Sequence, residues 1–276
     1  MSSYEAYDET SRNYDRTRVP IGSEIILGCL ARQARPLDTL TVLDAGCGTG
    51  AYSEAIVDRV GRVEALDMSQ GMLDAAAAKL ADAVARDRIG FHQGAITELP
   101  FGEASFDAVM INQVLHHLDD DAGAEYALHR RVIGEFARVL RSGGALIVNS
   151  SGQEQLEAYW YYHLVPELGA AMRRRFAPLD ALRRILTDTG FDYVGSFVPA
   201  DQVCQGDAFF DGHGPLDKAW RDGDSMWALA SGDQIEAACA RVRELDASGA
   251  LDHFVAAYDD RRRTIGQITF LYAIKR

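Results

Sequence analysis

The sequence has few cysteines and no long apolar run, and these absences exclude several classes of protein. Its four cysteines, Cys29, Cys47, Cys204 and Cys239, show no Cys-x-x-Cys spacing. Zinc sites and disulfide scaffolds need closely and regularly spaced cysteines, so we predict no metal and a reducing, cytoplasmic setting. No apolar run is long enough to span a bilayer, and residues 1–18 lack the apolar region of a signal peptide. We therefore expect no membrane partner.

Basic residues are also in the minority. The chain has 28 Lys and Arg against 41 Asp and Glu, a formal net charge of −13. Nucleic acid is bound mainly by neutralising its phosphates, so this balance disfavours a nucleic-acid partner. The short runs 173–175 and 261–263 are three arginines each. Such runs are usually solvated faces, with contact to an anionic substrate as the alternative. Either a monomer or a homodimer is compatible with this composition.

Apolar runs alternate with helical patterns through most of the chain. We predict strands near residues 41–44, 63–66, 90–93, 105–111, 145–149, 192–198 and 267–274, and helices near 52–60, 69–85, 132–140 and 178–189. Gly143 and Gly144 are expected to stop the third of these helices. Strands alternating with helices predict βαβ units and a parallel sheet covered on both faces, which is an α/β fold.

The second half is less regular. Residues 153–176 have a helical, aromatic-rich pattern. About 65 residues separate the last two predicted strands, too many for a plain loop. Within them, Ser231 and Gln234 form a capping-box pattern before an apolar helical face, and Gly249 is expected to end that helix. We interpret the stretch 200–265 as a helical insertion.

A glycine motif follows the first predicted strand. Gly46, Gly48 and Ala51 fit G-x-G-x-x-A, and Asp67 ends the next strand about 20 residues later. Glycines let the backbone approach a ligand closely, and an acid at the end of the second strand accepts hydrogen bonds from ribose hydroxyls. The motif indicates a nucleoside cofactor, although alone it also fits a nicotinamide-dependent dehydrogenase.

Five ordered segments narrow this choice. They are 42–50 (VLDAGCGTG), 66–69 (LDMS), 99–107 (LPFGEASFD), 112–118 (NQVLHHL) and 135–144 (EFARVLRSGG). Together they resemble class I S-adenosyl-L-methionine (AdoMet)-dependent methyltransferases, particularly the group that includes the ubiquinone and menaquinone biosynthesis enzymes. The resemblance covers about residues 40–150. It implies a Rossmann-like seven-strand sheet, mostly parallel with an antiparallel last strand.

The resemblance also implies which residues bind AdoMet and its product S-adenosyl-L-homocysteine. Gly46 and Gly48 would lie under the methionine part, Asp67 would bind the ribose and Met68 would pack on the adenine. The residues implied for the cofactor are Tyr14, Arg18, Asp44, Gly46, Cys47, Gly48, Asp67, Met68, Ala95, Ile96 and Asn112. Many relatives have an acid where this chain has Ala95, which cannot accept a bond from the adenine amino group. Backbone, Thr97 or water would have to replace it.

The acceptor side is less specified. His116 is our candidate general base because it follows the fourth predicted strand. The candidate substrate-binding residues are His117, Tyr159, Tyr162, His163, Trp220 and Trp227, with packing in a core as the alternative for each. We expect methyl transfer to O, N, S or C of a small molecule. A nucleic-acid or protein methyltransferase and a non-catalytic AdoMet-binding protein are the alternatives.

These expectations define one domain, 1–276, with several parts. Residues 1–40 would form an N-terminal helical lid and 41–150 the AdoMet-binding core. A cap helix region would follow at 151–177, and 178–200 with 265–276 would complete the sheet. The insertion 201–264 would cover the active site, where substrate ligands of open α/β sheets bind.

Overall fold

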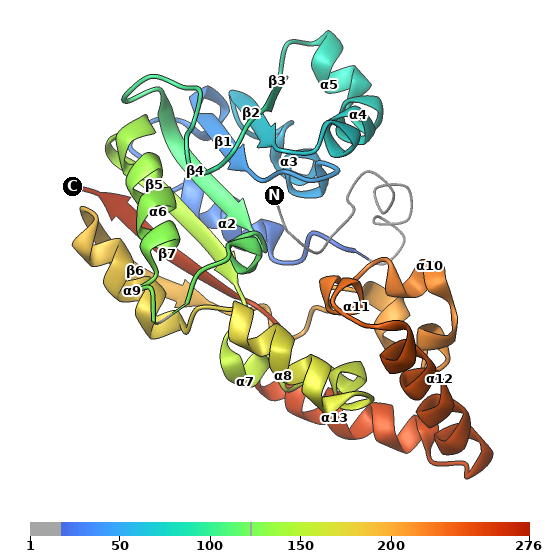
Figure 1. Ribbon diagram of the computed structural model, residues 1–276. Coiled ribbons are helices and arrows are strands. Elements are labelled where there is room, and N and C mark those ends of the chain that lie inside the picture. The colour runs from blue at the N-terminus through green and yellow to red at the C-terminus, as the bar shows by residue number, and fades with distance from the viewer. Residues whose placement is uncertain (1–17, 122) are drawn as a thin grey trace.

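A seven-strand sheet forms the centre of the computed structural model, which describes residues 18–121 and 123–276 (Figure 1). The strand order is β3-β2-β1-β4-β5-β7-β6. The strands are β1 (Thr41–Ala45), β2 (Arg62–Asp67), β3 (Ile89–Gln93), β4 (Phe106–Asn112), β5 (Leu140–Ser150), β6 (Phe191–Phe197) and β7 (Thr269–Lys275). The order reverses between β1 and β4, and ligands of open α/β sheets bind beside such a switch point.

The pairing confirms the predicted sheet. β1 to β5 pair in parallel, and β7 runs antiparallel to both β5 and β6. β6 therefore ends at the same edge of the sheet as β4 and β5. The insertion leaves from that edge and returns to it, so the following strand must run in the opposite direction. The same connection places the insertion beside the carboxyl ends of the parallel strands.

Helices cover both faces because side chains of a buried strand alternate between them. Val42 belongs to one core and its neighbour Leu43 to the other. The first core includes residues of α2 (Ser23–Leu30), α3 (Ala51–Ile56), α4 (Gln70–Lys79) and α5 (Ala81–Ala85). The second includes residues of α6 (Ala127–Val139) and α9 (Leu179–Asp188). Since α2 packs on the sheet, the described part of the predicted lid is a core helix.

A third core lies in a helical cap beyond the strand ends (Figure 1). The cap helices are α7 (Gln153–Leu156), α8 (Pro166–Arg175), α10 (Lys218–Arg221), α11 (Ser225–Ala228), α12 (Gly232–Ala247) and α13 (Leu251–Ile265). The cap also contains the 3-10 turns η4 (Trp160–His163), η5 (Gly206–Phe210) and η6 (Gly214–Leu216). The 3-10 turns η2 (Leu37–Thr39) and η3 (Leu115–His117) lie beside the sheet. Ser231 and Gln234 form the predicted capping box of α12, which confirms it.

Three predicted helices differ in detail. The pattern over 153–176 is broken into α7, η4 and α8, and Pro166 occupies the start of α8 because it has no amide to donate. Residues 69–85 form two helices, α4 and α5, that meet at Leu80. The helix α6 ends at Val139 and not at Gly143, because Leu140 already pairs with Phe106 as the start of β5. In the described part of the chain, every helix is too short or too polar to cross a membrane.

Candidate active site

The glycine turn after β1 leaves open space beside the sheet. Gly46 and Gly48 have φ of 79° and 53°, values that favour glycine. A Cβ on Gly46 would come within 2.6 Å of the Val114 side chain, whereas one on Gly48 would meet no atom within 4 Å. The turn after β1 thus contacts the segment after β4 on one side and offers backbone to a ligand on the other.

Asp67 stands at the end of β2 and closes this turn. Its Oδ2 accepts a hydrogen bond from the Gly48 amide at 2.9 Å, and its Oδ1 accepts one from the Ser69 amide at 2.9 Å. Burial raises the pKa of this carboxyl above its usual value. The carboxylate is half-buried, so its remaining lone pairs are available to ribose hydroxyls.

Asp44, at the buried end of β1, has an unused oxygen. Ser53 Oγ donates to its Oδ2 at 2.7 Å. The Asn112 side chain lies near enough to lower the pKa of this carboxyl, but Oδ1 makes no hydrogen bond of normal geometry among the described residues. Burial raises the pKa of Asp44 to about 7, and the neighbouring carboxylate of Asp67 adds to that rise. Buried carboxylate oxygens are normally paired, so Oδ1 needs a donor that a bound amino group would supply.

The other residues implied for the cofactor surround the same turn. Met68 is 38% exposed, Ala95 is half-buried and Ile96 is buried. Asn149 Nδ2 lies 3.4 Å from the Asn112 side-chain oxygen at the end of β4. Burial raises the pKa of the Cys47 thiol, which excludes a reactive thiolate there.

These features fit AdoMet: an open glycine backbone, an acid at the end of β2 and a buried carboxylate oxygen lacking a donor. The cofactor would supply an activated methyl group on a sulfonium. Tyr14, which we predicted to close over it, lies outside the described residues. Arg18, which we also predicted to bind the cofactor, forms an ion pair with Asp224 of the cap: its Nη2 is 3.3 Å from Asp224 Oδ2.

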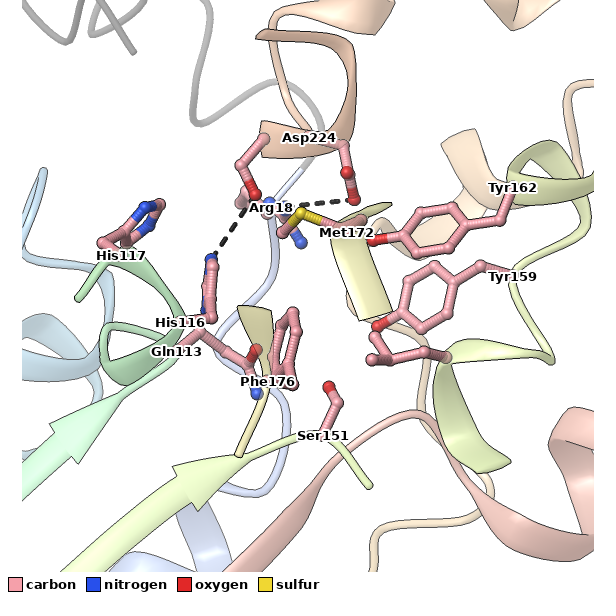
Figure 2. Close-up of a pocket in the computed structure, with 12 residues that line it drawn as sticks. Arg18, Gln113, His116, His117, Ser151, Tyr159, Tyr162, Met172, Phe176 and Asp224 are labelled. Atoms are coloured by element: carbon pink, nitrogen blue, oxygen red, sulfur yellow. Dashed lines mark hydrogen bonds and ion pairs between the residues drawn. The ribbon is translucent and has the colours of Figure 1, made fainter. Parts of the chain in front are cut away.

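A second, small cavity, of about 30 Å³, lies between the sheet and the cap. Figure 2 shows that its side chains come from the segment after β4, from the residue after β5 and from the cap. They are Arg18, Gln113, His116, His117, Ser151, Leu156, Tyr159, Tyr162, Met172, Phe176, Asp224 and Ser225. Gln113 follows Asn112 directly, so this space adjoins the segment that contacts the glycine turn. We call it the acceptor cavity.

The two histidines of the acceptor cavity are neutral. The His116 ring stacks on Phe176 with centroids 4.3 Å apart, and its Nε2 is 3.4 Å from Ser225 Oγ. Burial lowers the pKa of His116 well below its usual value, and the charges of His117, Arg18 and Arg175 lower it further. Burial, followed by Arg175 and Arg18, lowers the pKa of His117 to about 3. Both rings therefore stay unprotonated at neutral pH.

A buried network connects the N-terminal segment to the insertion. Asp224 Oδ1 caps α11 by accepting from the Met226 amide, and Oδ2 accepts from the Tyr161 hydroxyl at 2.7 Å. Gln205 Nε2 donates to the same hydroxyl at 2.7 Å. The Arg18 guanidinium faces Asp224 Oδ2, so residue 18 is fixed to a residue 206 positions away. The insertion thereby forms one wall of the acceptor cavity.

The structure brings only some of the predicted acceptor residues together. Tyr159 and Tyr162 point into the cavity from the cap, on the side opposite His116 (Figure 2). His163 does not, because it stacks on Tyr258 with centroids 4.2 Å apart. Trp220 and Trp227 are outside the lining as well, since both pack in the core of the cap. These three side chains pack within the cap, and their contact with a substrate stays a prediction.

Several lining residues were missed by the sequence reasoning. Ser151 follows β5 and Gln113 follows β4, so the rule that ligands bind at carboxyl ends of parallel strands could have found both. Gln113 also has a φ of 54°, a strained value for a residue other than glycine. Asp224 and Ser225 carry no local signal, because only the folding of the insertion brings them to the cavity.

Comparisons with known proteins agree with this geometry. Residues 43–148 match the model of a methyltransferase domain family. The chain is 32% identical over 145 residues to a demethylmenaquinone methyltransferase of Clavibacter sepedonicus, over 51% of this chain and 55% of that protein. It is 28% identical to one of Lactococcus lactis, over 67% of this chain and 74% of that protein. The chain thus spans about half of the first relative's length.

A solved structure shares the fold. It is described as a putative methyltransferase from an antibiotic biosynthesis pathway of Anabaena variabilis, with a TM-score of 0.71 and 21% identity, covering 93% of this chain and 98% of that one. The family match covers the glycine turn, Asp67 and the segment after β4. Through residues 43–148 the chain is therefore similar to class I methyltransferases, whose cofactor is AdoMet.

Proposed function

We propose that this protein transfers the methyl group of AdoMet to a small molecule held in the acceptor cavity. The observation that carries the proposal is the position of that cavity, directly after the strand end that borders the glycine turn. An acceptor there lies beside a cofactor bound over Gly48 and Asp67. The two relatives are named for demethylmenaquinone, which is also a small molecule.

The residues that line the acceptor cavity are suited to holding the acceptor in place more than to taking part in bond formation. In-line displacement needs the acceptor atom held close to the methyl carbon, and holding two reactants in place can lower a barrier by about 7–11 kcal/mol. Residues of the cap form one side of the cavity. His116 is buried, neutral and within the lining, so it is placed to accept a proton from an acceptor that must lose one.

The enclosure also favours a small molecule over a macromolecule. The lining comes from both the sheet and the cap, and Tyr159, Tyr162, Ser151 and Phe176 are all buried. A folded protein or a duplex would need the cap to open. A methyltransferase acting on such a substrate stays the alternative, together with a protein that binds AdoMet without transferring its methyl group.

The proposal is tested first at the cofactor. We expect calorimetry to detect AdoMet and S-adenosyl-L-homocysteine, and to detect neither NAD nor NADP. Asp67→Ala removes the acceptor of the ribose hydroxyls and should weaken binding by about 1.5–3 kcal/mol, roughly 10-fold to 150-fold. Asp74→Ala is the matched control, because Asp74 is an acid on α4 whose carboxylate accepts a hydrogen bond from the Gln70 side chain at the protein surface. Equal affinities for the parent and Asp67→Ala would contradict this site.

The second test addresses the transfer itself. The protein is incubated with methyl-labelled AdoMet and fractionated metabolite pools, and in parallel with protein and nucleic-acid fractions from the same source. We expect label in a small molecule only. Label in a macromolecule would support the alternative enzyme, and binding of AdoMet without any label transfer would support the non-catalytic protein.

A further inference from the structure

A buried asparagine near the end of β5 connects separate parts of the cofactor site. Asn149 is 1% exposed and pairs with Asn112 across the sheet. Its Nδ2 donates to the Tyr52 hydroxyl at 3.0 Å and lies 3.4 Å from Asn112 Oδ1, and its Oδ1 accepts from Gln113 Nε2 at 2.9 Å. Tyr52 lies on α3 just after the glycine turn, whereas Asn112 ends β4 and Gln113 follows it. One side-chain amide therefore contacts both segments that border the site.

Asn149 also holds a strained turn. Gln113 has a φ of 54°, in the left-handed region that residues other than glycine seldom adopt. Its backbone amide donates to the Asn149 carbonyl at 3.0 Å, and its side-chain amide donates to the Asn149 side-chain oxygen. A strained backbone persists only where the surrounding contacts determine it. These two hydrogen bonds to one residue fix the direction in which the chain leaves β4, and with it the position of Asn112.

Asn112 has an amide donor without a partner in the described part of the chain. The residue is 8% exposed, and its Nδ2 makes no hydrogen bond of normal geometry there. The neighbouring Asp44 Oδ1 is a buried acceptor in the same condition. Buried polar groups are nearly always paired, so a donor and an acceptor side by side indicate a ligand that carries both. The amino-acid end of AdoMet has an amino group and a carboxylate, which would satisfy the two together.

The direction of the Asn112 amide depends on Asn149. The Asn149 Nδ2 donor faces the oxygen of the Asn112 side chain, and this contact directs the Asn112 NH2 group the opposite way. Without that donor, nothing printed by the geometry of β5 distinguishes the two ends of the amide. Residue 149 lies outside the five segments that resemble methyltransferases, so the sequence gave no reason to consider it.

We propose that Asn149 is a positioning residue for the cofactor: it orients the Asn112 amide, whose Nδ2 then donates to the amino-acid end of AdoMet. Asn149 acts through Asn112 and makes no contact of its own with the cofactor. This role rests on the proposed function, because it assigns a further residue to the same cofactor site. It concerns binding and orientation only, so no bond is formed or broken.

A double-mutant cycle tests whether Asn149 acts through Asn112. Calorimetry at pH 8 measures the affinity for S-adenosyl-L-homocysteine in the full-length parent, Asn149→Ala, Asn112→Ala and the double variant. We expect Asn149→Ala to weaken binding about threefold to tenfold, the loss of one net hydrogen bond. In the Asn112→Ala background the same change should have almost no effect, because the amide that Asn149 orients is gone. An unchanged affinity of Asn149→Ala, or equal losses in the two backgrounds, would overturn this role, since a merely structural asparagine acts independently of Asn112.

Ser150→Ala is the matched control. Ser150 is the next residue of β5 and is also buried, but successive side chains of a strand point to opposite faces of the sheet. It should keep the affinity of the parent. A loss equal to that of Asn149→Ala would show that any change at the end of β5 disturbs the site, and would overturn the proposal.

A second variant serves if Asn149→Ala does not fold. Asn149→Asp has the same size and keeps an oxygen for Gln113 Nε2, but it has no donor for Asn112 Oδ1. It should lose affinity in the parent background and not in the Asn112→Ala background. A loss that persists without the Asn112 amide would contradict the proposal.

The same measurements separate this role from the proposed function. Failure of the parent to bind S-adenosyl-L-homocysteine would refute the proposed function, and with it the role of Asn149. Normal binding by the parent with equal losses in both backgrounds would refute the role of Asn149 alone and leave methyl transfer standing.

Discussion

Asp44 predicts a pH dependence of cofactor affinity. Burial raises its pKa from 3.8 to about 7, so the carboxyl is largely protonated at pH 6 in the free protein. A bound amino group that donates to the unused Oδ1 would favour the ionised form. Binding at pH 6 should therefore release about one proton, and the affinity for S-adenosyl-L-homocysteine should rise up to tenfold per pH unit until Asp44 ionises near pH 7.

The same shift affects stability with the opposite sign. Raising the pKa from 3.8 to about 7 corresponds to roughly 4 kcal/mol against the ionised form in the folded state. The folded protein holds a proton that the unfolded chain has lost between these values, so stability of the free protein falls as pH rises through that range. Asp44→Asn should remove this loss and raise the unfolding free energy at pH 8.

Calorimetry in two buffers of different ionisation enthalpy measures the proton release. Asp44→Asn keeps an oxygen for Ser53 but cannot ionise, so its affinity should be weaker at pH 8 and nearly independent of pH below 7. Asp67 also has a raised pKa, and this variant distinguishes the two acids. Proton release at pH 6 that persists in Asp44→Asn, or none in the parent, would refute the assignment of Asp44 to the amino group.

Two other predictions concern the acceptor side. His116→Gln should lower turnover by about 10²-fold where the acceptor must lose a proton, with unchanged cofactor affinity in calorimetry. Because the pKa of His116 is well below its usual value, turnover should be flat between pH 6 and 9, so the variant's rate and not the pH profile decides its role. Trp220→Ala should cost about 3–5 kcal/mol in urea unfolding, since Trp220 is buried in the cap and donates to the Ala208 carbonyl. An unfolding free energy equal to that of the parent would show that the core of the cap does not unfold together with the rest of the protein.

The cofactor half of the site was predictable from sequence because its determinants are local. A glycine turn, an acid at a strand end and a short apolar run lie within a few residues of one another, and parallel strands bring their carboxyl ends together. Gly48 and Asp67 accordingly meet through one hydrogen bond. The seven-strand, mostly parallel sheet and its antiparallel last strand were predicted from the resemblance, and the pairing confirms them.

The acceptor half was predicted less well because it depends on contacts between distant segments. Helical periodicity could show that Trp220 and Trp227 pack, but not whether they pack into a cavity or into a core. The contact of Arg18 with Asp224 joins residues 206 positions apart. The aromatic run 159–162 was predicted as continuous helix, whereas it is a 3-10 turn that points Tyr159 and Tyr162 toward the sheet.

The two halves of the site also differ in charge, and this difference bears on the reaction. The cofactor side carries the carboxyls of Asp44 and Asp67, which attract a cationic ligand. The acceptor side carries Arg18 and Arg175, whose charges help to keep His116 and His117 neutral. The acidic side therefore favours the sulfonium, whereas on the acceptor side Asp224 offsets the charge of Arg18. Once the methyl group has left, the product keeps the amino group and the ribose but has lost the sulfonium charge. Its attraction to the two carboxyls is therefore weaker than that of the cofactor, which favours exchange of product for cofactor.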